Sequence, residues 1–265
     1  MKDKIKSLLF KIAPGTAQTL QRTVQRRHVR QLEAGWGLPR VRSTYLEHQP
    51  FTVMSGPFAG MEYIENATGS MLLPKLVGSY EAELAPALQS ILATNYASVL
   101  DIGCAEGYYA VGLARGLQKA TVYAHDTDPL AQKMCAEMAR LNDVSARVQV
   151  GGEVNHAEMQ RILERGKSLV VCDCDGCERF LLDPQSVPAL RQSDLLVETH
   201  DFLDAGVTDA LRLRFAPTHT VSLFEMQTRN PQDWSAVSRL TPPDQEIALS
   251  EYRPAAQQWL YLVAR

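Results

Sequence analysis

Short apolar runs alternate with longer stretches of periodic apolar residues from about residue 81 to the last residue of the chain. In the longer stretches apolar residues recur every three or four positions, which is typical of helices with one buried face. Such regular alternation favours an α/β fold, with a mostly parallel sheet that is covered by helices on both faces. The short runs predict strands at residues 97–102, 120–125, 146–150, 168–173, 194–199, 219–226 and 258–264.

The helical pattern is clearest over residues 127–142, and a second helix is expected over residues 81–93. We expect the apolar stripe of the 127–142 helix to lie in the core. This stripe consists of Leu130, Met134, Met138 and Leu141.

Two further regions break the alternation. Residues 1–80 are predicted to be an N-terminal extension, with a basic helix, a hairpin over residues 50–64 and a segment that caps the substrate side. Residues 81–265 would form the main domain. Residues 227–256 are polar and proline-rich, and a connection of this length predicts a functional loop or lid.

The charge is distributed unevenly along the chain. The net charge is −3, but residues 1–40 carry +7 and the rest of the chain −10. An acidic body disfavours nucleic acid as a partner, because the phosphates would be repelled. The basic leader has an apolar helical face, so residues 1–32 could pack on their own domain, on the other copy of a homodimer, on a membrane surface or on RNA.

The five cysteines do not form the pattern of a secreted disulfide framework, so a cytoplasmic protein is expected. Cys172, Cys174 and Cys177 lie close together in sequence, which raises the question of a soft-metal site. A fourth ligand at zinc spacing is missing, and alternation along a strand turns Cys172 away from its neighbours. We therefore expect these cysteines to be small buried apolar residues.

The first predicted strand leads into a turn of small residues and then into a helix. Asp101, Gly103, Ala105 and Gly107 follow one another at alternate positions across this turn. Glycine allows the backbone to approach a ligand closely, so strand, turn and helix predict half of a nucleotide-type pocket. Asp126, 19 residues after Gly107, ends the second strand and is placed to bind ribose hydroxyls.

This segment resembles motif I of class I S-adenosylmethionine-dependent methyltransferases. A carboxylate near the turn suits a cationic sulfonium ligand and would repel a diphosphate. The step Gly151-Gly152-Glu153 resembles the part of these enzymes that lies beside the adenine. The resemblance implies S-adenosylmethionine as cofactor, bound by Asp101, Gly103, Cys104, Ala105, Gly107, Tyr108, Asp126, Thr127 and Glu153.

A second group of polar residues follows the fourth and fifth strands. Asp173, Asp175 and Glu178 come after the fourth strand, and Glu198 and His200 end the fifth. Because ligands bind beyond the carboxyl ends of strands in open α/β sheets, we expect these side chains to share one cleft with Asp101 and Asp126.

The Asp-x-Asp-Gly-x-Glu segment that begins at Asp173 resembles the Asp-x-Glu-Gly-x-Glu segment of FkbM-type methyltransferases. The residues Glu198-Thr199-His200 resemble the Glu-x-His of that family. The resemblance implies a Rossmann-like, seven-stranded sheet with a reversed last hairpin, and O-methylation of a sugar or natural product. Asp175 departs from the family, which has Glu there, and this leaves the substrate open.

We expect His200 to act as general base, with Asp173 and Asp175 beside it, because a histidine titrates near working pH. A histidine that only hydrogen-bonds a neighbouring strand end is the alternative. The clustered carboxylates could hold Mg²⁺ or Mn²⁺, with Asp175 and Glu198 as ligands. Alternatively, they bind substrate hydroxyls or the amino group of the cofactor.

These observations predict a methyltransferase that acts on a hydroxyl of a sugar-like small molecule. Two alternatives remain at this point. One is a nucleic-acid methyltransferase that is recruited by the basic leader, although no Asn/Asp-Pro-Pro-aromatic motif is present. The other is a non-catalytic module that binds the cofactor.

Overall fold

The computed structural model describes residue 35 and residues 37–253 and 255–265 of the chain. Its centre is a seven-stranded sheet with the order β3-β2-β1-β4-β5-β7-β6. β1 to β5 pair in parallel, and β7 runs antiparallel to both β5 and β6. The predicted fold class is confirmed, and each strand lies within two residues of its predicted bounds. The strands are β1 (Ser98–Ile102), β2 (Thr121–His125), β3 (Val148–Gly151), β4 (Ser168–Cys172), β5 (Asp194–Thr199), β6 (His219–Glu225) and β7 (Gln258–Ala264).

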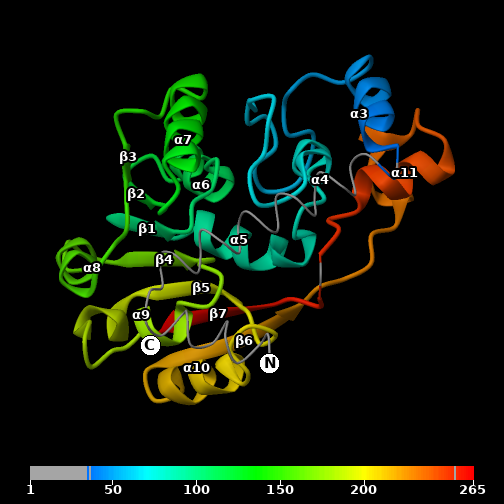
Figure 1. The fold of residues 1–265 in the computed structure, drawn as a ribbon. Helices are drawn as coiled ribbons and strands as arrows, with labels where there is room; N and C mark the ends of the chain where they lie inside the picture. Colours follow the sequence, from blue (N-terminus) through cyan, green and yellow to red (C-terminus); the bar gives the residue numbers. More distant parts are fainter. Residues whose placement is uncertain (1–34, 36, 254) are drawn as a thin grey trace.

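Helices cover the sheet on both faces, with α6 and α7 on one side and α8, α9 and α10 on the other (Figure 1). The α-helices are α3 (Leu38–Leu46), α4 (Leu72–Val77), α5 (Ala85–Leu92), α6 (Tyr108–Gly116), α7 (Pro129–Leu141), α8 (His156–Leu163), α9 (Glu178–Leu181), α10 (Val207–Phe215) and α11 (Pro242–Leu249). The short 3-10 helices are η1 (Ala82–Leu84), η2 (Pro188–Gln192), η3 (Pro231–Asp233) and η4 (Ser235–Val237).

The central strands read as continuous apolar runs because both of their faces are buried. Successive side chains point to opposite faces, so Val99 belongs to one hydrophobic core and Leu100 to the other. Asp101 follows on the same face as Val99, near the carboxyl end of β1. The parallel strands therefore bring the polar residues at their carboxyl ends to one edge of the sheet, and the two apolar cores lie on its two faces.

The described part of the extension shares a core with the sheet, since Val41 and Leu76 lie in the same apolar cluster as Leu113 of α6. The predicted hairpin is reduced to one antiparallel bridge between Thr52 and Glu62. The domain boundary at residue 80 stays a prediction. The predicted basic helix and the possible membrane contact of residues 1–32 lie outside the described residues.

The connection between β6 and β7 is folded. It contains η3, η4 and α11, and α11 packs against α3 and α4 of the extension (Figure 1). Arg40 of α3 donates two hydrogen bonds to Asp244 of α11, at 2.5 and 2.8 Å. The segment predicted to be a loop or lid, residues 227–256, is therefore held against the extension. We call this connection between β6 and β7 the strap.

Two details of the helices differ from the prediction. The helix expected over 81–93 begins as the 3-10 turn η1, because Glu81 takes a left-handed conformation with φ +47° and Pro86 limits the start of α5. Leu130 is 51% exposed, so the apolar stripe of α7 starts one turn later than expected. Among the described helices, none has the length and apolar character that crossing a bilayer requires.

Candidate active site

The turn after β1 adopts a conformation that requires its glycines. Gly103 and Gly107 have φ values of +84° and +99°, a region that favours glycine. A Cβ atom on Gly103 would lie only 1.7 Å from the carbonyl oxygen of Asp173 in the next strand connection. The close approach that the structure shows is between two backbone segments, and the predicted approach of the turn to a ligand stays a prediction. Gly107 is the N-cap residue of α6.

Asp126, at the end of β2, is tied to this turn. Its Oδ2 accepts a hydrogen bond from the amide of Ala105 at 3.0 Å, and its Oδ1 accepts one from the amide of Asp128 at 2.8 Å. Ala105 itself has φ +49°. The carboxylate predicted to bind ribose thus also holds the glycine turn in place.

Asp101 is buried and faces the same space. Its Oδ2 atom has no hydrogen-bond partner among the described residues. Burial, with the negative charges of Asp173 and Asp126, raises the pKa of Asp101 to about 8. A cationic group next to Asp101 would satisfy this oxygen and favour the carboxylate form, as the amino group of S-adenosylmethionine would.

Two adjoining cavities lie beyond the strand ends, and both are lined by Gly103 and Asp126. Of the predicted cofactor residues, Gly107 alone lines neither cavity. Thr127 and Glu153 line the second cavity, together with Ile102, Val154, Phe180 and Leu181, and this wall is largely apolar. The first cavity joins the predicted cofactor side to the predicted catalytic side, since it is lined by Asp101, Cys104, Ala105, Tyr108, Asp173, Asp175, Glu198 and His200.

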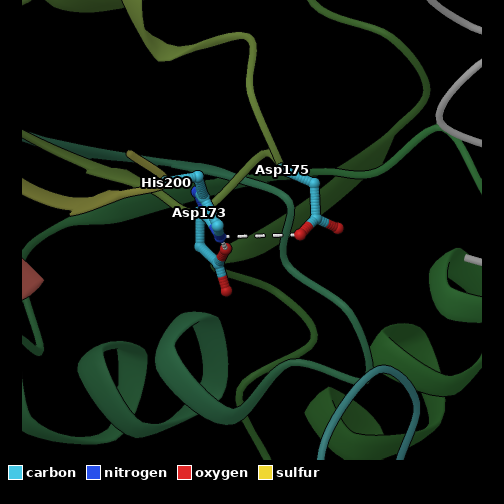
Figure 2. A group of neighbouring side chains, drawn as sticks. All are labelled: Asp173, Asp175 and His200. Carbon is cyan, nitrogen blue, oxygen red and sulfur yellow. Dashed lines mark ion pairs between the residues drawn. The ribbon is translucent and has the colours of Figure 1, made fainter. Parts of the chain in front are cut away.

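His200 is the centre of the predicted catalytic side. Its Nδ1 lies 2.6 Å from Oε1 of Glu178, and both side chains are buried. Its Nε2 lies 3.5 Å from Oδ1 of Asp175 and 3.6 Å from Oδ1 of Asp173 and Oε2 of Glu198. Figure 2 shows the carboxylate of Asp175 directed at the imidazole from the neighbouring loop. The predicted convergence of these side chains is present.

The surroundings of His200 favour its charged form. Burial opposes the charge, but the carboxylate of Glu198 and the hydrogen bond with Glu178 outweigh burial and raise the pKa of His200 well above its usual value. A cation that binds nearby, such as a sulfonium, would lower this pKa and release the base form.

The cleft contains an arginine that the sequence did not single out. Arg253, in the strap before β7, donates to Glu198 Oε1 at 2.9 Å and to the Tyr80 hydroxyl at 3.1 Å, and it also pairs with Glu81. Burial and the charge of Asp173 raise the pKa of Glu198, whereas Arg253 opposes this rise. Arg253 thus joins the extension, the strap and β5 at one point of the cavity.

Gln257 and Lys75 also line this cavity and were not predicted. The Oε1 atom of Gln257 is buried and has no hydrogen-bond partner among the described residues. Lys75 is buried in an ion pair with Glu106, which also accepts a 2.5 Å hydrogen bond from Tyr63. Because these contacts join segments far apart in sequence, no local pattern could have revealed them.

The predicted metal ligands need one adjustment. Among the described residues, the group that could hold a metal ion is Asp173, Asp175 and His200, whose ligand atoms all lie within 4.8 Å of one another. Glu198 was expected to be a ligand, but one of its oxygens is engaged by Arg253. Asp175 stays a candidate ligand, and the metal itself stays a prediction.

The expectation for the cysteines is partly wrong. Cys174 and Cys177 form a disulfide, and Cys172 remains a buried thiol with its Sγ 3.6 Å from that of Cys174. Burial raises the pKa of the Cys172 thiol, so this residue behaves as the small apolar side chain that was predicted. The pairing depends on how the loop after β4 turns, and strand alternation carries no information about that loop.

Comparison with known proteins finds similarity to methyltransferases over the segment that contains the predicted cofactor residues. Residues 85–174 match the family described as ribosomal protein L11 methyltransferase (PrmA). Over 61 residues the chain is 43% identical to a ribosomal protein L11 methyltransferase of Herpetosiphon aurantiacus. The aligned segment covers 23% of this chain and 19% of that protein. The alignment therefore spans about a fifth of the relative.

Solved structures resemble the fold at low sequence identity. A precorrin-6y C5,15-methyltransferase from Geobacter metallireducens is 8% identical, with a TM-score of 0.47, and the match covers 68% of this chain and 89% of that one. A putative O-methyltransferase from Klebsiella pneumoniae is 15% identical, with a TM-score of 0.43 and coverages of 71% and 80%.

The match over residues 85–174 is to a methyltransferase family, in agreement with the predicted enzyme class, a class I S-adenosylmethionine-dependent methyltransferase. It contains the glycine turn, Asp126 and Glu153, so S-adenosylmethionine is the cofactor expected for this class. The FkbM-like subfamily and the acceptor stay predictions.

Proposed function

We propose that this protein transfers the methyl group of S-adenosylmethionine to a hydroxyl of a sugar or another small metabolite. The observation that carries the proposal is the single cavity that joins Asp101, Gly103 and Asp126 to His200. A sulfonium bound beside Asp101 would direct its methyl group toward the imidazole. Methyl transfer needs this kind of alignment, because it is an in-line displacement by an oxygen whose proton must leave.

The cofactor would occupy both cavities. Its amino acid part and sulfonium suit the carboxylate-rich first cavity, and its adenine suits the apolar wall around Ile102, Val154 and Leu181 in the second. Asp126 lines both cavities, and its oxygens can accept further hydrogen bonds from ribose hydroxyls.

On the acceptor side, hydrogen-bond acceptors predominate. Asp173, Asp175, Glu198 and Gln257 line this space, and Arg253, which also lines it, is already paired with Glu198. Such a lining suits a molecule that donates several hydrogen bonds, as a sugar does, and disfavours phosphate esters. With Nδ1 held by Glu178, the Nε2 atom of His200 is the atom that would take the hydroxyl proton.

A divalent cation is the finer part of this proposal. Asp173, Asp175 and the Nε2 atom of His200 would hold Mg²⁺ or Mn²⁺, which would lower the pKa of an acceptor hydroxyl. In that case Nε2 is a ligand instead of the base, and the hydroxyl would lose its proton to solvent. Glu178 orients the imidazole from behind, as carboxylates do for metal-bound histidines.

A protein acceptor is the second candidate, because the matched relative is named for a ribosomal protein. To separate the candidates, the full chain would be incubated with a cell extract and S-adenosylmethionine labelled on its methyl group. Label in the small-molecule fraction supports the proposal. Label in the protein fraction favours the second candidate, and label in nucleic acid would revive the alternative of an RNA substrate.

Cofactor binding is tested separately by calorimetric titration of S-adenosylhomocysteine into the full chain. We expect Asp126→Asn to weaken binding by about tenfold, since it loses one charged acceptor in the pocket. Asp143→Asn is the matched control, because Asp143 is exposed and left-handed with φ +56°, a conformation that asparagine tolerates. Absence of binding to the unaltered protein would refute the proposal.

A further inference from the structure

The loop between β4 and α9 is closed by a covalent bridge. Cys174 and Cys177 form a disulfide with a Cα–Cα distance of 5.6 Å, and only Asp175 and Gly176 lie between them. We propose that this pair is a reversible thiol–disulfide site, that its reaction partner is a dithiol reductant, and that its state sets the affinity for the cofactor. The last part rests on the proposed function.

The bridged loop fixes the geometry of the catalytic side. Asp175 has φ +56°, which is unfavourable for a residue with a Cβ and persists only where the surroundings enforce it. The amide of Gly176 donates to Oε1 of Glu178 at 3.1 Å, and the same oxygen lies 2.6 Å from His200. The bridge therefore constrains the loop from which Asp175 and Glu178 both reach His200.

The same bridge forms part of the wall on the adenine side. Cys174 and Cys177 line the second cavity together with Phe180, Leu181, Thr127 and Glu153. When the bridge opens, the two sulfur atoms are no longer bonded and the Cys177 end of the loop can move away from β4. A mobile apolar wall binds the adenine ring less tightly, because the wall must then be ordered on binding, and this ordering costs conformational entropy.

The exchange needs only the dithiol as its second reactant. A thiolate of the dithiol attacks Sγ of Cys177, which is partly exposed; the S–S bond breaks, and Cys174 leaves with the electron pair and takes up a proton. The second thiol then attacks the mixed disulfide and releases Cys177, which is protonated in turn. The protein disulfide gains two electrons and two protons, and the dithiol becomes a disulfide.

The neighbouring thiol is protected from this exchange. Cys172 is fully buried in the core, whereas Cys177 lines a cavity. A reductant in solution therefore reaches Cys177 first. The arrangement separates one accessible sulfur from two buried ones, Cys172 and Cys174, within six residues of chain.

The test uses the full chain, equilibrated with oxidised glutathione or with dithiothreitol. Alkylation followed by mass spectrometry counts the free thiols, and calorimetry gives the dissociation constant of S-adenosylhomocysteine for each form. We expect two fewer alkylated cysteines after oxidation, located at 174 and 177, and binding about tenfold weaker after reduction. Free Cys174 and Cys177 under oxidising conditions would overturn the proposal, as would equal affinity of the two forms.

Variants locate the effect. Cys177→Ser should bind as the reduced protein does, with or without dithiothreitol, whereas Cys172→Ala keeps both bridging cysteines and should keep the redox response. If a variant does not fold, the two forms of the unaltered protein still decide the question. If neither form binds S-adenosylhomocysteine, the proposed function fails and the link to the cofactor fails with it, while the alkylation result still shows whether the disulfide exists.

Discussion

The Oε1 atom of Glu178 lies 2.6 Å from Nδ1 of His200 in the interior of the protein. A carboxylate in this position accepts the Nδ1 proton, so the other ring nitrogen faces the cavity. Three more carboxylates lie within 3.6 Å of that nitrogen. Glu178 is thus the residue that decides which atom of His200 is available to a substrate.

Replacement of Glu178 by glutamine should lower the pKa of His200, because a buried negative charge next to the imidazole is removed. The ring signals of His200, followed by NMR against pH in chelator-treated protein, would measure this shift. Glu137→Gln, on the exposed side of α7, is the control. An unchanged titration in Glu178→Gln would show that Glu178 does not set the state of the imidazole.

How far the sequence predicted this site depends on the range of the contacts. Asp101, Asp126 and His200 lie at the carboxyl ends of strands that meet at one edge of the sheet, so a local pattern and one topological rule brought them together correctly. Arg253 reaches Glu81 across 172 residues, and such a contact leaves no trace in local periodicity. The disulfide was missed for a related reason, since it depends on a left-handed turn at Asp175.

Asp101→Asn should stabilise the free protein at alkaline pH. The folded state holds the pKa of Asp101 at about 8, above the ordinary value of 3.8, so its contribution to stability is complete below pH 4 and is lost as pH rises to about 8. Asparagine has no charge to bury. Urea unfolding should show no difference near pH 4 and a gain of about 5 kcal/mol at pH 9, since the pKa is raised by about four units. A gain that is independent of pH would contradict a buried carboxylate as the cause.

Arg253→Met should destabilise the protein, and more so at higher pH. It leaves Glu81, Glu198 and Glu251 without the guanidinium that pairs with them, and a buried pair broken on one side costs about 3–5 kcal/mol. The pKa of Glu81 is raised by burial to about 7 even with Arg253 present, so the loss should shrink below that pH as the carboxyls become neutral.

Arg212→Gln is the matched control for this variant, because the Arg212 side chain is 52% exposed and its pair with Asp209 lies at the surface. Such a pair contributes less than about 1 kcal/mol. Unfolding by urea at pH 5 and pH 8 compares the two variants. Equal stability of Arg253→Met and the unaltered protein would show that the strap does not depend on this network.

Gly103→Ala should prevent the turn after β1 from forming. Its Cβ would lie 1.7 Å from a backbone oxygen of Asp173, and its φ of +84° is unfavourable for alanine. We expect a loss of at least about 3 kcal/mol or failure to fold. Gly206→Ala separates the two causes, since Gly206 has φ +75° but no atom within 4 Å of the added Cβ. It should cost only about 1 kcal/mol in a thermal unfolding measurement.

Manganese binding would distinguish a metal centre from a purely organic site. The donor atoms of Asp173, Asp175 and His200 lie within 4.8 Å of one another, so one Mn²⁺ per chain should bind to chelator-treated protein. Because the metal needs the imidazole without its proton, and the pKa of His200 is raised, binding should strengthen as pH increases. Asp175→Asn should weaken binding by about tenfold or more, whereas Asp209→Asn, whose side chain is 79% exposed, should not. If titration calorimetry detects no Mn²⁺ binding at pH 8, the metal part of the proposal fails, and the Nε2 atom of His200 is the base that takes the proton of the acceptor hydroxyl.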